Sequence, residues 1–247
     1  MIRRSYFVAA YYASWAVFGG VSLLLNLACL PLLLLPRRGR YGRRVRAVIR
    51  SLFGCWLRWF HACGVAKISW HGFEAPLPAG CIYIANHPTL LDATFLLARL
   101  PDAICIFKPA LMRNPAIAPA AIMAGYFVGE PGVDLVRDVA ARIAAGQSLL
   151  VFPEGTRTGR SEICGALRPG FALIASRAHA PVQLIEIRTT PDFGTRGRPW
   201  WRAPGVLPAR VELTLGCRWE YEPARSPSQL TAQVQRHLLA SLPSPAR

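Results

Sequence analysis

The chain begins with a long uncharged run, and this run limits what its N-terminus can fold into. Between Tyr6 and Pro36 there is no Asp, Glu, Lys or Arg, although the 247-residue chain has a net charge of +16. About 20 apolar residues in a helix cross the hydrocarbon core of a bilayer, so this run is long enough to do so. We therefore expect residues 1–36 to form a hydrophobic membrane anchor. Asn26 and Pro31 leave two shapes open, a spanning helix and a re-entrant helical hairpin.

The residues that follow favour a retained anchor over a cleaved signal peptide. A signal peptide has a shorter apolar region and then a small-residue cleavage site. Here Leu-rich sequence leads into seven arginines, at positions 37, 38, 40, 43, 44, 46 and 50. Only Arg3 and Arg4 precede the run, so the charge bias predicts a cytoplasmic location for the residues after it. Arginines beside a membrane also attract anionic lipid, by about 1 kcal/mol each.

Residues 37–65 are predicted to form a basic amphipathic connecting helix. Apolar residues recur there at helical spacing, namely Val45, Ile49, Leu52, Phe53, Trp56 and Phe60. The helix either lies on the membrane surface or packs against the domain that follows. Farther along, Trp200 and Trp201 either enter the membrane interface or belong to a loop beside a strand.

Composition argues against several classes of protein. Much of the arginine content fits a GC-rich genome, and no DNA- or RNA-binding motif accompanies it, so we expect no nucleic-acid partner. A basic surface would also suit an acidic protein partner. The seven cysteines contain no C-x-x-C pair, so the sequence indicates neither a zinc site nor a disulfide framework.

From residue 66 onward, strand-like and helix-like segments alternate. This pattern predicts an α/β fold with a mostly parallel central sheet flanked by helices, over residues 66–241, and then a flexible tail at 242–247. The expected strands are 68–72, 81–85, 103–107, 148–152, 182–187 and 211–215. The expected helices are 89–99, 115–125, 134–145, 169–179 and 227–241, with Asp134 as an N-cap.

The first candidate site is the run from Asn86 to Asp92, Asn-His-Pro-Thr-Leu-Leu-Asp, which follows a predicted strand. Pro88 keeps His87 out of the helical region and suits the first position of a helix, with His87 as its cap. Asp92 could then hold one imidazole nitrogen and leave the other to act as a general base. Asn86 could orient the backbone or a substrate. The alternative is a strand-to-helix turn with an incidental histidine and a surface aspartate.

The second candidate site is the run from Phe152 to Arg157, Phe-Pro-Glu-Gly-Thr-Arg, which also follows a predicted strand. Pro153 and Gly155 predict a turn. The arginine offers a planar fork that matches a phosphate, and loop amides can add donors. The alternative is a polar connection with a solvated arginine. Because ligands bind at the carboxyl ends of strands in open parallel sheets, we expect the two runs to share one site.

Together, N-H-x4-D and F-P-E-G-T-R about 65 residues later resemble the motifs of the glycerolipid acyltransferase family, typified by lysophosphatidic acid acyltransferases, over residues 66–217. The resemblance implies that His87, supported by Asp92, deprotonates the hydroxyl of a lysophospholipid. That hydroxyl attacks a thioester of acyl-CoA or acyl-carrier protein, a co-substrate, with no metal or redox cofactor. It also implies a bacterial inner membrane, with the catalytic domain on the cytoplasmic face. The substrate-binding residues it implies are Asn86, Lys108, Glu154, Gly155, Thr156 and Arg157.

Two departures from the family pattern leave the acceptor open. The stretch Gly125–Pro131 matches the second motif but lacks its basic residue, although Lys108 matches the lysine before that motif. The fourth motif keeps one proline, Pro181, instead of two. Less positive charge in the acceptor site makes a different lysolipid, an amino-acid lipid, a glycolipid or an aryl-polyene-type lipid alternative acceptors.

Two other functions compete with acyl transfer. A hydrolase could use His87 and Asp92 to activate water, although the absence of a G-x-S-x-G elbow disfavours a serine hydrolase. A lipid-binding scaffold that has lost activity is the second rival, and the intact His87 and Asp92 argue against it.

Overall fold

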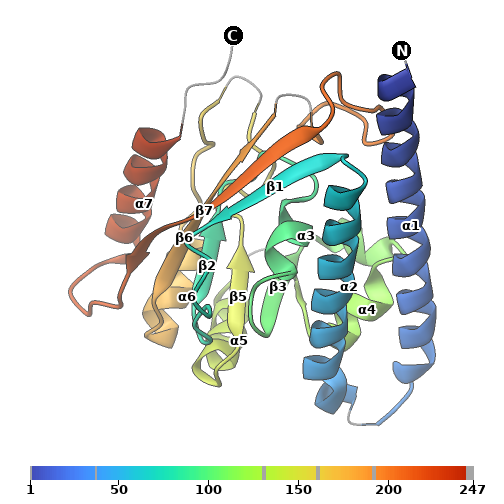
Figure 1. Cartoon of the computed structure of the whole chain (residues 1–247). Coiled ribbons are helices and arrows are strands. Elements are labelled where there is room, and N and C mark those ends of the chain that lie inside the picture. Colours follow the sequence, from blue (N-terminus) through green and yellow to red (C-terminus); the bar gives the residue numbers. More distant parts are fainter. Residues whose placement is uncertain (1, 37, 130–131, 160–161, 191–192, 243–247) are drawn as a thin grey trace.

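The computed structural model describes residues 2–36, 38–129, 132–159, 162–190 and 193–242. Its centre is a seven-stranded sheet with the strand order β1-β7-β6-β2-β5-β3-β4 (Figure 1). Strands β6, β2, β5, β3 and β4 are parallel, whereas β7 is antiparallel to β6 and parallel to β1. The predicted mostly parallel α/β sheet is confirmed. The strands are β1 (Ala66–His71), β2 (Ile82–Ala85), β3 (Ala103–Phe107), β4 (Phe127–Val128), β5 (Ser148–Val151), β6 (Val182–Thr189) and β7 (Ala209–Trp219).

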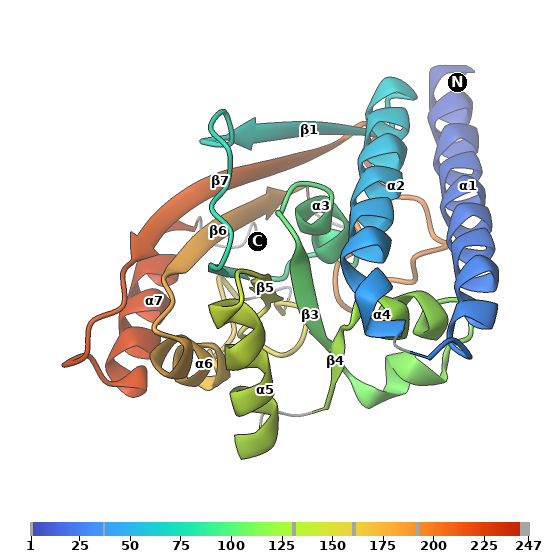
Figure 2. The same cartoon turned by 90° about the horizontal axis from the view of Figure 1, so that it is seen from below.

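Helices cover both faces of the sheet (Figure 2), because successive residues of a buried strand point to opposite sides. In β2, Tyr83 packs into a core formed with α2 (Gly42–Ala62) and α3 (Asp92–Leu97). Ile82 and Ile84 pack into a second core on the other face. The helices of that face are α5 (Val133–Ala144), α6 (Gly170–Ala178) and α7 (Pro227–Ser241).

The N-terminal run forms one unbroken helix, α1 (Ile2–Leu32), so of the two shapes that the sequence left open the structure has the single helix and not a hairpin inside this run. Pro31 lies in the last turn, and the chain reverses only afterwards, through η1 (Arg38–Tyr41). Asn26 is buried because it caps the start of α4 (Ala118–Ala124), where the Ala120 N–H donates to Asn26 Oδ1 at 2.9 Å.

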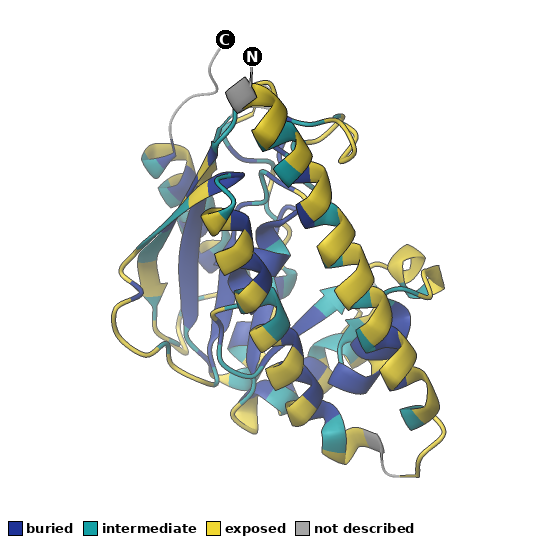
Figure 3. Ribbon diagram, turned by 45° about the vertical axis from the view of Figure 1, so that its right-hand side comes forward, coloured by how far each residue is buried: buried dark blue, intermediate teal, exposed yellow. Residues whose placement is uncertain are grey.

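The outer face of α1 is exposed and apolar along its length (Figure 3). Leu24 is 68% exposed and Leu30 is 53% exposed. Within the described residues, one helix, Arg4–Leu32, is long and apolar enough to cross a membrane. The inner face packs against α2 and α4.

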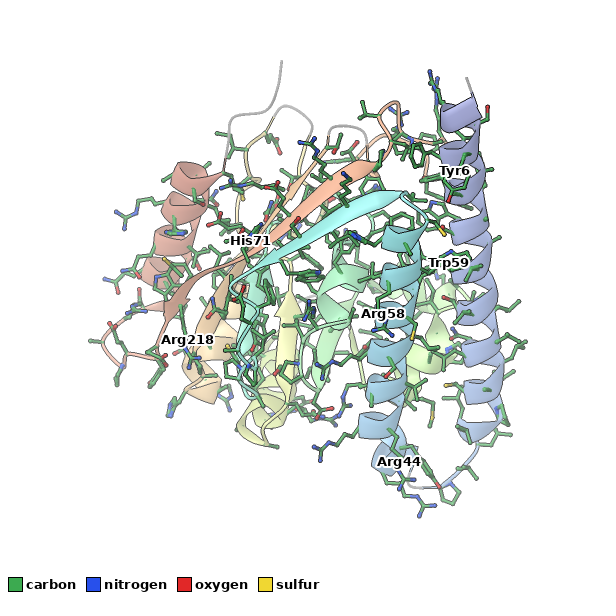
Figure 4. All side chains as sticks on the ribbon, viewed as in Figure 1. Tyr6, Arg44, Arg58, Trp59, His71 and Arg218 are labelled. Atoms are coloured by element: carbon green, nitrogen blue, oxygen red, sulfur yellow. The ribbon has the colours of Figure 1, made fainter. Side chains whose placement is uncertain are left out.

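Helix α2 packs on the domain, and its predicted apolar face is buried at Val45, Ile49, Trp56 and Phe60. Arg46 is a buried exception, 5% exposed, whose Nε donates to Asp102 Oδ1 at 2.8 Å. Other arginines of this helix, such as Arg44 and Arg58, are exposed (Figure 4).

Several boundaries differ from the predictions. Helix α3 begins at Asp92 rather than at residue 89, and α5 is capped by Gly132, which leaves Asp134 inside its first turn. Strand β4 and the 3₁₀ segment η2 (Pro109–Arg113) were not predicted. Of the predicted flexible tail, Leu242 is buried and residues 243–247 lie outside the described part.

Candidate functional site

His87 and Asp92 meet beyond the carboxyl end of β2, beside the end of the parallel strand β5. His87 Nδ1 lies 2.8 Å from Asp92 Oδ2. The Asp92 side chain is 0% exposed, whereas that of His87 is 20% exposed. A carboxylate that accepts from Nδ1–H leaves Nε2 as the basic nitrogen of the ring. Asp92 is therefore not a surface residue, and the pair has the arrangement of a general base with its orienting acid.

Thr89 completes the surroundings of the Asp92 carboxylate. Its backbone N–H donates to Asp92 Oδ2 at 2.7 Å, and its Oγ1 donates to Asp92 Oδ1 at 2.6 Å. Burial raises the pKa of Asp92, while the hydrogen bonds and charge of His87 and the bonds from Thr89 act in the opposite direction. These bonds form a turn through residues 89–91, so α3 cannot begin before Asp92 and His87 is not its cap.

Glu154 joins the second motif to the first. Its Oε1 accepts hydrogen bonds from the His87 backbone N–H, at 3.0 Å, and from Thr158 Oγ1, at 2.8 Å. Its Oε2 accepts one from the Gly165 backbone N–H, at 2.8 Å. The Thr158 backbone N–H also donates to the His87 carbonyl, at 2.8 Å. The carboxylate is buried and engaged with the chain itself, so its geometry is that of a positioning residue.

Two further contacts hold the His87 ring and the backbone of the residue before it. The ring of Phe152 stacks on the imidazole, with ring centroids 4.1 Å apart and an interplanar angle of 19°. The buried Asn86 side chain pairs with the backbone of Ile187, donating to its carbonyl at 2.8 Å and accepting from its N–H at 2.7 Å. Asn86 thus orients the backbone, by extending the pairing of β2 with β6 beyond the last strand residue.

Arg157 and the turn before it carry the groups that suit an anion. Arg157 Nη1 donates to the carbonyls of Gly194 and Thr195, at 3.0 and 3.3 Å. Gly155 has a φ of +68°, a conformation that favours glycine. Within the described residues, the exposed Thr156 and the partly buried Arg157 donate no hydrogen bond from their backbone N–H groups. Consecutive free amides after a left-handed glycine make a concavity that can bind an anion.

The remaining predicted cation, Lys108, follows β3 directly and is exposed. Because β3 is parallel to β5, Lys108 lies at the same edge of the sheet as the two motifs. Glu130 and Pro131, at the end of the second-motif stretch, lie outside the described residues. In the part of the chain that is described, no group of three His, Cys, Asp or Glu residues could hold a metal ion.

The sequence motifs identified His87 and Asp92 as a candidate base and acid. They did not identify the residues that hydrogen-bond to the carboxylates of the two motifs or stack on the imidazole. Thr89 and Thr158 were missed, although a hydroxyl residue three before Asp92 and another four after Glu154 are spacings at which side chains can meet across a turn. Phe152 was predicted as the end of a strand and the start of the second motif, with no role of its own. No local signal marks its stacking on His87, because the two residues are adjacent only in space.

Comparisons with known proteins found a family model and solved structures that match this chain. A family model described as Acyltransferase matches residues 67–188. No curated protein sequence matches the chain significantly. Eight solved chains match, among them the crystal structure of the 1-acyl-sn-glycerophosphate (LPA) acyltransferase, PlsC, from Thermotoga maritima. That structure is 22% identical, covers 98% of this chain and 96% of its own, and has a TM-score of 0.69. At this identity the likeness shows a shared fold.

Proposed function

Because the chain belongs to the glycerolipid acyltransferase family, we propose that it moves a fatty acyl group from an acyl thioester to the hydroxyl of a lysophospholipid such as lysophosphatidic acid. The donor is acyl-carrier protein or acyl-CoA. His87 is the base, Asp92 orients it, and Arg157 binds the acceptor phosphate. The observation that carries this proposal is the 2.8 Å contact between His87 Nδ1 and the fully buried Asp92 carboxylate.

The proposed reaction is a direct transfer. His87 Nε2 takes the proton of the acceptor hydroxyl as its oxygen attacks the thioester carbonyl. Asp92 stabilises the imidazolium that results. The tetrahedral intermediate then collapses, the carbon–sulfur bond breaks, and the imidazolium returns its proton to the departing thiolate. The products are an ester and a free thiol, and no acyl group is bonded to the enzyme.

Binding of the acceptor is assigned to the turn after β5. The free amides of Thr156 and Arg157 and the Arg157 guanidinium can hold a phosphate, with Lys108 at the same edge of the sheet. Glu154 enters this proposal as a positioning residue, because its three hydrogen bonds hold the His87 backbone and the loop beside it.

The membrane anchor is connected to this turn through a single loop, residues 193–208. The Trp200 carbonyl accepts from Tyr11 Oη, and the Trp201 carbonyl accepts from Tyr12 Oη at 3.0 Å, so α1 holds one end of the loop. The same loop supplies the carbonyls that hold Arg157. We assign the outer face of α1 and the exposed Trp201 to the lipid of a bacterial inner membrane, on its cytoplasmic side.

The assay that tests the function offers both thioester donors, with a radiolabelled acyl chain, to membranes that contain the wild-type chain and a panel of acceptors. We expect label in phosphatidic acid when lysophosphatidic acid is the acceptor. Label in another lipid would instead identify a different acceptor. Absence of transfer to every acceptor, with release of free fatty acid instead, would favour a hydrolase and contradict the proposal.

Membrane binding by the outer face of α1 has a test of its own. Leu24→Asp is expected to weaken binding of the purified chain to anionic vesicles by about 100-fold, because an aspartate in hydrocarbon costs about 3 kcal/mol. Leu239→Asp, on α7 at the opposite end of the molecule (Figure 1), is the matched control and should bind as the wild type does. Vesicle flotation measures both, and equal flotation of the two variants would exclude α1 as the lipid-binding face.

A further inference from the structure

The proposed acceptor site has less positive charge than the family pattern implies, since the second-motif stretch lacks a basic residue. One terminal nitrogen of Arg157, Nη1, is already committed to the carbonyls of Gly194 and Thr195. A phosphate with two negative charges is held best by more than one cation. A second guanidinium or ammonium group beside the turn would supply the missing charge.

Arg168 lies against this turn. Its backbone N–H donates to the Pro153 carbonyl at 2.9 Å, which ties it to the start of the turn. A Cβ atom on Gly155 would lie 3.1 Å from Arg168 Nε and 3.3 Å from Arg168 Cζ. The guanidinium therefore rests on Gly155, and the lack of a side chain at that position is what lets it approach so closely.

Among the described residues, the Arg168 guanidinium has no counter-ion. It is exposed, and it makes no hydrogen bond or ion pair with any residue that the structure describes. The carboxylate of the turn, Glu154, is buried and already accepts three hydrogen bonds. An uncompensated guanidinium next to the free amides of Thr156 and Arg157 has the donor set that binds a phosphate.

We propose that Arg168 is a second cation of the acceptor site and selects acceptors that carry a phosphate. This inference rests on the proposed function, because it names a residue of the same site. Arg168 binds the phosphate and takes no part in proton transfer, which belongs to His87. Its position accounts for a phosphate-bearing acceptor in a chain whose second-motif stretch lacks the basic residue.

Steady-state kinetics test the role of Arg168 in turnover. Arg168→Gln should raise the KM for lysophosphatidic acid by about 10- to 100-fold, the effect of losing a charge-assisted hydrogen bond, with little change in kcat. Arg168→Lys should recover part of the loss, and a monoacylglycerol acceptor, which has no phosphate, should be unaffected. The control is Arg177→Gln, an exposed arginine in the last turn of α6. Equal effects on both acceptors, or an unchanged KM, would overturn the assignment.

Direct binding separates failure of this inference from failure of the proposed function. With the purified full-length chain, calorimetry should show glycerol 3-phosphate binding to the wild type and to Arg177→Gln alike, and at least tenfold more weakly to Arg168→Gln. That result in a chain without acyl transfer would keep the Arg168 site and reject the acyltransferase proposal. Equal binding to all three proteins, or no binding to the wild type, would reject the Arg168 site.

Discussion

Replacing His87 by alanine is expected to lower kcat for acyl transfer by about 10³-fold, because the substitution removes the group proposed to take the proton of the attacking hydroxyl. The protein should remain folded, since His87 is partly exposed and, among the residues that the structure describes, its imidazole is hydrogen-bonded only to Asp92 and stacked only on Phe152. Turnover with saturating thioester and acceptor measures the effect, and vesicle flotation checks that the variant still binds membranes.

The control for this experiment is His71→Ala. His71 is exposed at the end of β1, away from the two motifs in sequence, and is labelled in Figure 4. Its substitution should leave kcat unchanged. If His87→Ala retained the kcat of the wild type, the general-base mechanism would be wrong. A scaffold protein would keep its function in both variants.

Replacing Glu154 by glutamine is expected to lower the free energy of unfolding by about 1–3 kcal/mol and to reduce kcat, with little change in the KM for the acceptor. Glutamine keeps the size of the side chain but offers one acceptor oxygen instead of two. One amide or hydroxyl partner among His87, Thr158 and Gly165 then faces an NH₂ group, and a buried donor left unpaired costs about 1–3 kcal/mol. Chemical denaturation and steady-state kinetics on the same preparation give both quantities.

Glu162→Gln is the matched control for the Glu154 experiment. Glu162 follows in the same loop and is exposed, and it accepts a hydrogen bond from the Gly159 N–H at 3.2 Å. We expect its substitution to change stability by less than about 1 kcal/mol. If Glu154→Gln instead raised the acceptor KM at unchanged stability, Glu154 would be the substrate-binding residue that the family resemblance implied.

The position of Glu154 gives a physical reason why the two motifs belong together. His87 follows β2 and Glu154 follows β5, and these strands are hydrogen-bonded neighbours. A buried carboxylate that bridges the two loops fixes the backbone of the base relative to the turn proposed to hold the acceptor. The reacting hydroxyl and the base must meet within hydrogen-bond distance, so this bridge bears on the rate as well as on stability.

Short-range patterns in the sequence predicted many of the helices and strands. Apolar runs of strand length located β2, β3 and β5, and the Ser-Pro signal before α7 corresponds to a capping box between Ser226 and Gln229. The uncharged N-terminal run, expected to be helical, forms the single helix α1. These features depend on the polarity and backbone preferences of neighbouring residues, which are written directly in the sequence.

Predictions from neighbouring residues failed where a side chain, rather than the backbone, formed the hydrogen bonds that set the conformation. Pro88 suggested a helix that starts beside His87, but Thr89 and Asp92 bond to each other and hold that segment as a turn. Asn26 suggested a break in the N-terminal run, yet its side chain is satisfied by α4 in a distant part of the chain. In both cases the partner of a polar group decided the conformation.

The sequence by itself determined the α/β class, the pairing of His87 with Asp92, and the arginine-bearing turn after β5. Only the tertiary structure decided which hydrogen bonds and ion pairs each polar group makes. Asn86 and Glu154 are engaged inside the protein, whereas Arg168 forms no ion pair with the part of the chain that the structure describes. The reason is that residue type sets which bonds a side chain can make. Whether those bonds are already made depends on segments far apart in the chain that the fold brings together.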